Sequence, residues 1–395
     1  MAKQTVREVD WAGKRALVRV DFNVPFERGT SRISDDIRIR EAIPTINHLR
    51  NGGASVVLCT HLGRPGGTRR VDLQLTPIAE RLATLLSTTV DYVHDAPGDQ
   101  ALAKANALEA GQVLLVENIR FWEGEEANDP GFAQAIGRLA DVYVNDAFGT
   151  AHRAHASTEG VAHVLPGVAG LLMEKEVTFL GGVLDDPKRP LAALLGGAKV
   201  SDKIKVLERL IDHADALYVG GGMAATFLKA KGLGIGNSLL EGNLVDFCAE
   251  VLVRCKAAGT TLTLPTDVVI AQKLEAGIPT RTVAADAVPD DWMILDIGPE
   301  SADLFANQLG TMGTVVWNGP MGVFEVPPFH TGTRVVAEGL AAGSAVTIIG
   351  GGSTAEVVDA LGLADEMTHV STGGGASLEF LEGKVLPGVA ALQDK

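Results

Sequence analysis

Residues 191–203 have the sequence LAALLGGAKVSDK. Five apolar residues end at two glycines, and an amphipathic stretch follows them. A continuous apolar run of this length is typical of a strand that is buried on both faces of a parallel sheet. A glycine turn between such a strand and a helix is the repeating unit of doubly wound α/β folds. The stretch therefore predicts a parallel-sheet α/β protein.

The same pattern recurs along the chain and predicts further parallel strands. Strands are expected at residues 16–20, 56–59, 113–116 and 142–144, and again at 191–195, 217–219, 261–264, 314–317, 346–349 and 368–370. A chain of 395 residues is long for a single hydrophobic core. We therefore expect two doubly wound, Rossmann-like domains with a boundary near residues 166–170, joined by a hinge helix over residues 171–184.

Composition excludes several classes of function. The net charge of −15 argues against nucleic acid and against a polybasic membrane contact. The three cysteines, Cys59, Cys248 and Cys255, lack the spacing of a disulfide framework or a zinc site, so we expect reduced, buried thiols. The polar N-terminus and the lack of an apolar stretch of ~20 residues predict a cytoplasmic protein.

Polar and basic residues follow the strands of the first half, where ligands bind in open α/β sheets. They are Asp21, Phe22 and Asn23 after the first strand, His61, Leu62, Gly63 and Arg64 after the second, Arg120 after the third, and His152, Arg153 and His155 after the fourth, with Arg38 at the start of a predicted helix. Each could be an ordinary surface charge or a scaffold residue. Together they predict a site for a small, multiply anionic substrate, because the planar fork of arginine matches carboxylate and phosphate oxygens.

Glycine-rich segments follow the strands of the second half. They are Gly196-Gly197-Ala198-Lys199, Gly220-Gly221-Gly222-Met223, Gly350-Gly351-Gly352-Ser353-Thr354 and Gly373-Gly374-Gly375-Ala376-Ser377. Glycine allows a ligand to approach the backbone, and a helix N-terminus offers free N–H groups, so these segments predict phosphate or nucleotide binding. Tight helix–strand packing is the alternative for each one. Lys199 and Lys203 are expected on one face of the helix that follows Gly197, facing the phosphates.

Two rival functions start from other features. The spacing Gly220-x-Gly222-x-x-Ala225, with Glu241 further on, resembles the dinucleotide fingerprint and favours an NAD-dependent dehydrogenase. It follows the second strand of its domain, however, and leaves the other glycine segments unexplained. A non-catalytic, two-lobed solute-binding protein would also use arginines and a hinge. No P-loop signature is present.

Seven further segments, read together with RVDFNVP at residues 19–25, resemble the phosphoglycerate kinases. They lie at residues 61–65, 117–121, 145–155 (NDAFGTAHRAH), 173–176, 196–204 (GGAKVSDKI), 317–325 (WNGPMGVFE) and 371–377 (STGGGAS). The match runs in order over almost the whole chain. The resemblance implies reversible phosphoryl transfer between 1,3-bisphosphoglycerate and ADP, giving 3-phosphoglycerate and ATP in glycolysis, by a monomer.

The resemblance also implies a division of labour. A phosphoglycerate-binding domain would comprise residues 1–170 and about 379–395, and a nucleotide-binding domain residues 171–378. Substrate contacts would be Asp21, Phe22, Asn23, Arg38, His61, Leu62, Gly63, Arg64, Arg120 and Arg153. Nucleotide contacts would be Gly197, Ala198, Lys199, Lys203, Gly221, Asn318, Glu325 and residues Gly350, Gly351, Gly352, Ser353 and Thr354. Catalysis would involve Arg38, Lys203, Gly373 and Gly374.

One departure from the resemblance concerns magnesium. Phosphoglycerate kinases usually have an aspartate after the third glycine of the segment at 350–352, and it helps to hold the Mg²⁺ of the nucleotide. Here the residue is Ser353, which can ligate Mg²⁺ but brings no charge. We expect Mg²⁺ to be held by Ser353 and by the phosphates of ADP or ATP. No general base is expected, because both nucleophiles are ionised at neutral pH, and catalysis becomes positioning and charge stabilisation.

Overall fold

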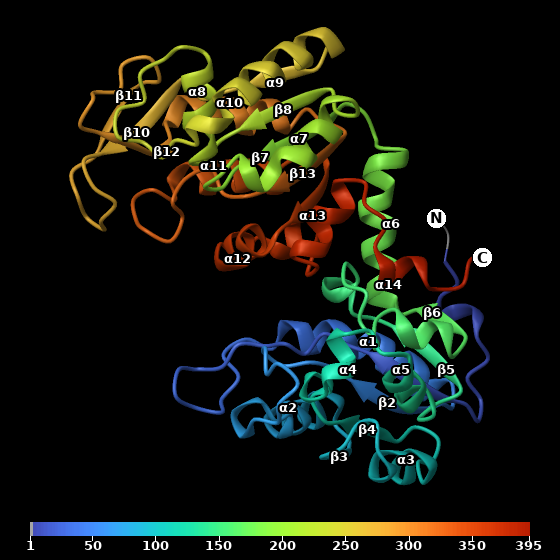
Figure 1. Cartoon of the computed structure of the whole chain (residues 1–395). Coiled ribbons are helices and arrows are strands. Elements are labelled where there is room, and N and C mark those ends of the chain that lie inside the picture. The colour runs from blue at the N-terminus through green and yellow to red at the C-terminus, as the bar shows by residue number, and fades with distance from the viewer. Residues whose placement is uncertain (1–2) are drawn as a thin grey trace. The chain divides into compact units, whose positions relative to one another are not determined.

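The computed structural model describes residues 3–395, which form two compact units (Figure 1). Unit 1 contains the described residues up to Thr178 together with Val385–Lys395, and unit 2 is Phe179–Lys384. The first border falls inside helix α6 (Leu171–Asp185), later than the sequence predicts, because Leu171 packs into the core of unit 1. The second border also lies later, since Leu381 is buried in unit 2 beside Gly350.

Unit 1 is built on a six-stranded parallel sheet in the order β3-β4-β2-β1-β5-β6. Its strands are β1 (Arg15–Arg19), β2 (Ser55–Cys59), β3 (Val90–Val93), β4 (Val113–Val116), β5 (Val142–Asn145) and β6 (Gly167–Ala169). Its helices are α1 (Ile37–Asn51), α2 (Thr76–Leu86), α3 (Asp99–Asn106), α4 (Glu123–Glu126), α5 (Pro130–Gly137), the first half of α6, and α14 (Pro387–Ala390). The strands β3 and β6 lie at the two edges of the sheet and are not predicted by the sequence.

In unit 1, helices α1 and α2 pack on one face of this sheet and form a hydrophobic core with it. Val18, Leu58 and Leu115 point to this face and pack with Ile39 and Ile78 from the two helices. The alternate strand residues Leu17, Val57 and Leu114 are also fully buried. Burial of both faces explains why these strands read as continuous apolar runs, as expected for a parallel sheet.

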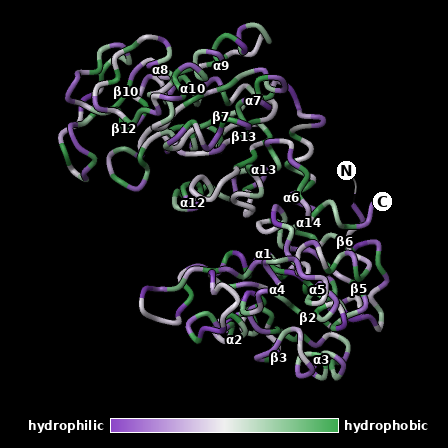
Figure 2. Tube along the Cα trace, in the orientation of Figure 1, coloured by the Kyte–Doolittle hydropathy of each residue, from purple (hydrophilic) through white to green (hydrophobic). Residues whose placement is uncertain are grey.

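Unit 2 contains a second six-stranded parallel sheet, in the order β15-β14-β13-β7-β8-β9. Its strands are β7 (Leu191–Leu195), β8 (Ala216–Val219), β9 (Thr261–Thr263), β13 (Thr314–Asn318), β14 (Val346–Gly350) and β15 (His369–Val370). Its helices are the second half of α6, α7 (Ile204–Ile211), α8 (Met223–Ala230), α9 (Val245–Ala258), α10 (Pro299–Leu309), α11 (Thr331–Ala341), α12 (Gly352–Ala360) and α13 (Gly375–Leu381). Figure 2 colours β7 as hydrophobic along its length. The prediction of two doubly wound parallel-sheet domains is confirmed.

A small antiparallel sheet in unit 2 is absent from the sequence prediction. It consists of β10 (Asp267–Ala271), β11 (Arg281–Ala284) and β12 (Met293–Ile297) in the order β11-β10-β12. The strand β11 is mostly exposed, so it lacks the apolar signal that reveals the other strands.

Each parallel sheet has a point where the strand order reverses. In unit 1 it lies between β1 and β5, and in unit 2 between β7 and β13. Loops diverge at such a point and leave room for a ligand beyond the carboxyl ends of the strands. The predicted site residues Asp21 and Asn23 follow β1, while Gly196 follows β7 and Asn318 ends β13. This topology gives one candidate ligand position in each unit.

Two smaller predictions can be compared with the structure. Cys59, Cys248 and Cys255 are free and buried, as predicted. Within residues 3–395, no helix combines the length and the apolar character that crossing a membrane requires.

Candidate functional site

Backbone and side-chain hydrogen bonds tie the loops after β1, β2 and β4 to one another in unit 1. The backbone N–H of Phe22 donates to the hydroxyl of Thr60 at 2.9 Å. The side-chain oxygen of Asn23 accepts from the backbone N–H of Gly63 at 2.9 Å, and Arg120 donates to the carbonyl of Gly63 at 2.8 Å. The structure therefore brings these three predicted segments together at one edge of the sheet.

Arg38 joins this group from the first turn of α1. Its Nη1 donates to the carboxylate of Asp21 at 3.1 Å and to the carbonyl of Asn23 at 3.3 Å. The side chain is 37% exposed, so part of the guanidinium remains accessible to a ligand. A half-buried arginine that is oriented by a carboxylate suits an anion-binding role.

Two of the predicted histidines, His61 after β2 and His155 after β5, are kept neutral by burial and by the surrounding arginines. Desolvation, with the charges of Arg19 and Arg120, holds the pKa of His61 well below its usual range. The same causes lower the pKa of His155 to about 4. At neutral pH the positive charge of this site therefore resides on arginine, and the histidines can serve as neutral hydrogen-bond donors.

Burial also acts on Arg120, which is 3% exposed. Desolvation lowers its pKa to about 10, although the Glu126 carboxylate, 3.3 Å from its Nε, opposes this. Arg120 stays charged at neutral pH. We call Arg38, His61, Arg120 and Arg153 the basic cluster.

Other predicted substrate residues are placed less directly. Arg64 is exposed on the segment after β2. Arg153 is half-buried, its Nε donates to His152 at 3.1 Å, and its charge acts on His61. The side chains of Phe22 and Leu62 are buried in the core of unit 1, so these two residues can meet a ligand only through their backbone.

Sequence reasoning missed the residues beneath the basic cluster. Arg19 is fully buried, and its Nε donates to the hydroxyl of Ser157 at 2.8 Å. The Ser157 hydroxyl in turn donates to the buried carboxylate of Glu125 at 2.6 Å. Arg19 lies inside the RVDFNVP segment, and a basic residue within an apolar strand is the one signal that could have revealed it.

In unit 2, the loops after β7, β8 and β13 are joined by backbone hydrogen bonds. Gly197 N–H donates to the carbonyl of Pro320 at 2.9 Å, and Gly221 N–H donates to that of Met321 at 2.9 Å. A Cβ on Gly196 would lie 2.2 Å from the oxygen of Pro320, and one on Gly220 would lie 2.5 Å from the sulfur of Met321. Gly196 and Gly220 therefore serve close packing, the alternative reading of these glycines.

The glycine loops after β14 and β15 have several positions that face open space, whereas Gly197 is the one such glycine in the described loops after β7 and β8. A Cβ on Gly352, Gly374 or Gly375 would meet no atom within 4 Å. Gly351 has a φ of +87° and precedes α12, whose first N–H groups have no side-chain cap. Unoccupied N–H groups at a helix start, reached through glycine, form an arrangement that binds phosphate.

Lys203 and Asn318 lie together beside these loops. The Lys203 ammonium donates to the side-chain oxygen of Asn318, and burial lowers the pKa of Lys203. Because lysine only donates, this contact fixes the amide orientation and leaves Asn318 Nδ2 as a free donor. That nitrogen is buried and has no hydrogen-bond partner among the described residues. A Cβ on Gly351 would lie 3.0 Å from it, so the donor borders the glycine loop.

The prediction that Lys199 and Lys203 share a helical face is wrong. A 3₁₀ turn, Ser201–Lys203, precedes α7, which begins only at Ile204. Lys199 lies before that turn and is exposed. Residues 198–200 connect the Gly197 turn, where φ is +92°, to the 3₁₀ turn. The helix therefore starts later than the pattern predicts.

The dinucleotide fingerprint has a strand and a helix around it, yet its acidic residue is elsewhere. The Glu241 carboxylate accepts from the backbone N–H of Ser201 at 3.1 Å. It does not follow the next strand, β9, which starts at Thr261. The strand β8 is also one strand away from the point where the order reverses. Glu241 is therefore not in the place that a dinucleotide-binding acidic residue would take, which argues against a dehydrogenase.

The remaining predicted nucleotide residues have mixed surroundings. Ser353 and Glu325 are exposed, as is Ala198. Thr354 is fully buried and its hydroxyl accepts from Gly319 N–H at 2.7 Å, so its side chain fixes the loop. Gly373 N–H donates to the Ser371 hydroxyl at 3.1 Å.

Residues 3–395 contain no group of three or more His, Cys, Asp or Glu side chains that could hold a metal ion. A magnesium ion at Ser353 would thus depend on oxygen atoms from a bound nucleotide. Its donor set, one hydroxyl and phosphate oxygens, consists of the oxygen ligands that Mg²⁺ prefers.

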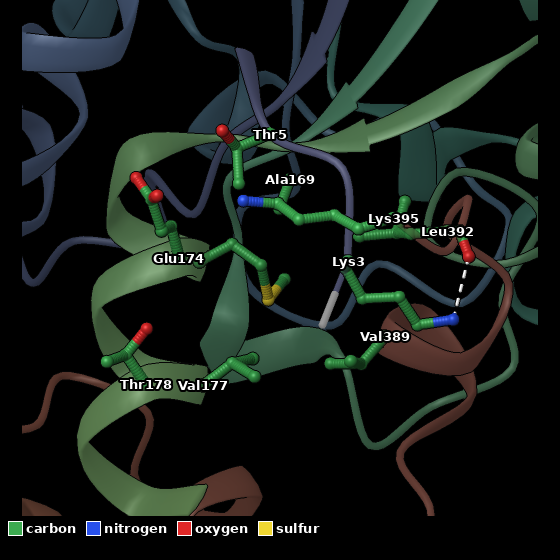
Figure 3. A pocket seen from close by; sticks show the side chains of 10 residues that line it. Lys3, Thr5, Ala169, Glu174, Val177, Thr178, Val389, Leu392 and Lys395 are labelled. Carbon is green, nitrogen blue, oxygen red and sulfur yellow. Dashed lines mark hydrogen bonds between the residues drawn. The ribbon is translucent and has the colours of Figure 1, made fainter. Parts of the chain in front are cut away.

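A small pocket in unit 1 lies apart from both groups (Figure 3). It has a volume of about 140 Å³, and its lining includes Thr5, Met173, Glu174, Leu392 and Lys395. Lys3, which also lines it, donates to the carbonyl of Leu392 at 2.8 Å. None of the predicted site residues lines this pocket.

Comparison with known proteins identifies the family of this chain. A family model described as "Phosphoglycerate kinase" matches residues 6–384. The chain belongs to the phosphoglycerate kinase family. Phosphoglycerate kinases of Herpetosiphon aurantiacus and Moorella thermoacetica are each 54% identical to it over 395 residues, covering 100% of both sequences.

Solved phosphoglycerate kinases have the same fold. The structure from Coxiella burnetii has a TM-score of 0.91 and 41% identity, and covers 98% of both chains. That from Pyrococcus horikoshii has a TM-score of 0.82 and 32% identity, again over 98% of both. The family's reaction is the reversible transfer of a phosphoryl group from 1,3-bisphosphoglycerate to ADP, giving 3-phosphoglycerate and ATP in glycolysis.

Proposed function

We propose that unit 1 holds 3-phosphoglycerate or 1,3-bisphosphoglycerate in the basic cluster, and that unit 2 holds ADP or ATP at its open glycine loops. The observation that carries this division is the contrast between the two sheet edges. One edge gathers arginines around Asn23 and His61, whereas the other offers unoccupied backbone N–H groups beside Lys203. Arginine forks suit a compact carboxylate and phosphate, and glycine loops suit a polyphosphate chain.

The substrate contacts of unit 1 are Asn23, Arg38, His61, Arg120 and Arg153, with Asp21 orienting Arg38. Support comes from the hydrogen bonds that join Asp21, Asn23, Gly63 and Arg120 with Arg38. The exposed Arg64 and the backbone of Phe22, Leu62 and Gly63 would complete the contacts.

The nucleotide contacts of unit 2 are the loops at Gly350–Thr354 and Gly373–Gly374, together with Lys203 and Asn318. The unpartnered Nδ2 of Asn318 supports this assignment, since a buried amide donor is costly without an acceptor, and a phosphate oxygen would supply one. The exposed Glu325 would contact the ribose, while Gly197, Ala198, Lys199 and Gly221 would line the approach. Ser353 and oxygen atoms of the nucleotide phosphates would hold Mg²⁺, which would supply positive charge against the phosphates.

Phosphoryl transfer at this site needs no general base from the protein. Both the carboxylate and the ADP oxygen are ionised at neutral pH. The neutral state of His61 and His155 fits a binding role rather than proton transfer. We assign charge stabilisation on the transferring phosphoryl group to Arg38, with Lys203 and the backbone of Gly373 and Gly374 acting beside it.

A substrate held by each unit must meet the other for transfer to occur. We propose a closing motion that excludes water, with α6 as the hinge element, because α6 is the helix in which the border between the units falls. A cytoplasmic monomer is part of the same proposal.

The test measures the binding of each ligand to the protein separately. Isothermal titration should give 3-phosphoglycerate binding that weakens in Arg120→Met and is unchanged in Lys203→Met. Mg-ADP binding should show the reverse pattern. If one variant lost affinity for both 3-phosphoglycerate and Mg-ADP while the other kept affinity for both, the division between the units would be wrong.

A further inference from the structure

Arg19 makes its contacts from a fully buried position at the end of β1. Its Nε donates to Ser157 at 2.8 Å, its Nη1 donates to the carbonyl of Val20, and its Nη2 lies 3.1 Å from Nδ1 of His61. Arginine has only N–H donors and no acceptor, and it stays charged in proteins. The contact with His61 therefore has one possible direction.

His61 must accept this hydrogen bond through Nδ1, because two donors facing each other would repel. A neutral imidazole carries one proton, so an accepting Nδ1 places that proton on Nε2. The Asp21 carboxylate faces this ring and lies 3.9 Å from Nδ1, beyond hydrogen-bond distance. The positive charges that face the ring come from Arg19 on β1, Arg38 on α1, Arg120 after β4 and Arg153 after β5.

Glu125 and Ser157 hold Arg19 in this position. Ser157 donates its hydroxyl proton to Glu125 at 2.6 Å and its backbone N–H to the same carboxylate at 2.9 Å. With its proton committed to Glu125, the hydroxyl oxygen of Ser157 is free to accept from Arg19. A buried carboxylate therefore fixes the serine, the serine fixes the arginine, and the arginine fixes the histidine.

We propose that Glu125, Ser157 and Arg19 are positioning residues that lock His61 as the neutral tautomer with its proton on Nε2, so that this nitrogen donates to an oxygen of the bound phosphoglycerate. The inference deepens the proposed function and rests on it only for the identity of the acceptor. The tautomer itself is a property of the free protein. Arg19 is thereby a residue that acts through His61 and is not required to touch the substrate.

The tautomer is read by long-range ¹H–¹⁵N NMR on the ¹⁵N-labelled protein without substrate. The signals of His61 are identified by their loss in His61→Asn. We expect the neutral form with the proton on Nε2 at neutral pH. A proton on Nδ1, or an imidazolium, in the wild-type protein would overturn the proposal whatever the enzyme's activity.

Two variants test the positioning chain. Arg19→Met/Glu125→Gln removes both buried charges together, so that neither is left unpaired. Ser157→Ala keeps both charges and removes only the link. In each we expect a mixture of His61 tautomers and a KM for 3-phosphoglycerate raised by about ten- to a hundredfold, with kcat changed much less.

The matched control is Arg15→Met, at the opposite end of β1, where Arg15 contacts Asn106 and Asp141. It should leave both the tautomer and the KM unchanged. An unaltered tautomer in Ser157→Ala and the double variant would overturn the positioning role. If the double variant does not fold, the wild-type spectrum and Ser157→Ala decide. If the His61 tautomer changed in the variants as expected but the wild-type protein did not turn over 3-phosphoglycerate, only the proposed function would be wrong.

Discussion

The guanidinium of Arg38 lies 3.1 Å from the carboxylate of Asp21, and the same nitrogen donates to the carbonyl of Asn23. The start of α1 is thereby tied to the loop after β1. This contact orients an arginine that is otherwise accessible, which is the condition for using its charge on a reacting group without a cost of reorganisation.

Replacement of Arg38 by alanine should lower kcat by ~10³–10⁵, because an arginine that stabilises phosphoryl-transfer charge typically contributes this much. The affinity for 3-phosphoglycerate should change far less, since other arginines remain. Steady-state kinetics and titration measure the two effects. The control is Arg40→Ala on the same helix, where Arg40 pairs with Asp36 and should be dispensable. Equal losses in the two variants would remove Arg38 from the catalytic role.

Replacement of Lys203 by methionine should lower kcat/KM for Mg-ATP by ~10²–10³, the usual effect of losing one preorganised donor to a developing charge. The change also releases Asn318, whose amide orientation depends on Lys203. Lys205→Met is the matched control, because Lys205 is exposed two residues further along. Wild-type kinetics in Lys203→Met would contradict its assignment.

Replacement of Ser353 by aspartate should reduce the magnesium concentration that gives half-maximal activity, because a carboxylate adds charge to a site that otherwise has a hydroxyl. Ser353→Ala should move the requirement the other way. The measurement is a magnesium titration of activity at fixed nucleotide. If neither substitution moved the midpoint, Ser353 would not be a ligand.

Asp146 should make stability fall as the pH rises. Asp146 follows β5, is fully buried and accepts from the N–H of Leu172 in the first turn of α6 at 2.9 Å. Desolvation raises its pKa from 3.8 to about 6. Between these values the folded protein keeps a proton that the unfolded chain has lost. The contribution of Asp146 to the free energy of unfolding is therefore greatest below about pH 4. It falls by roughly 3 kcal/mol in total as the pH rises from there through about 6.

Asp146→Asn should flatten this decline, since asparagine keeps the acceptor and removes the titration. Melting temperatures of both proteins from about pH 4 to about pH 8 measure the effect. The exposed Asp303 on α10 provides the control Asp303→Asn. An unchanged pH dependence in Asp146→Asn would show that this carboxyl is not the source.

The sequence predicts the strands of the two sheets well where burial is complete. The strand Leu191–Leu195 is buried on both faces, so its apolar run is unambiguous. The edge strand β3 is largely half-exposed and β6 has only three residues, which leaves no such signal. The antiparallel strands β10–β12 were missed because no rule of alternating strand and helix applies to them.

The site is predictable in part for a similar reason. Residues that follow strands, such as Asp21 and His61, gather because parallel strands end at one edge. Glu125 and Ser157 are brought beneath Arg19 by packing between α4 and the loop after β5, and their spacing in the chain does not reveal it. The separate functions of Gly196 and Gly352 likewise depend on atoms from other loops.

The most direct test of the account measures ADP formation from Mg-ATP with and without 3-phosphoglycerate, over a range of magnesium. We predict turnover that requires 3-phosphoglycerate and that nearly disappears in Arg38→Ala. Absence of 3-phosphoglycerate-dependent turnover in the wild-type protein at every magnesium concentration would contradict the proposed function.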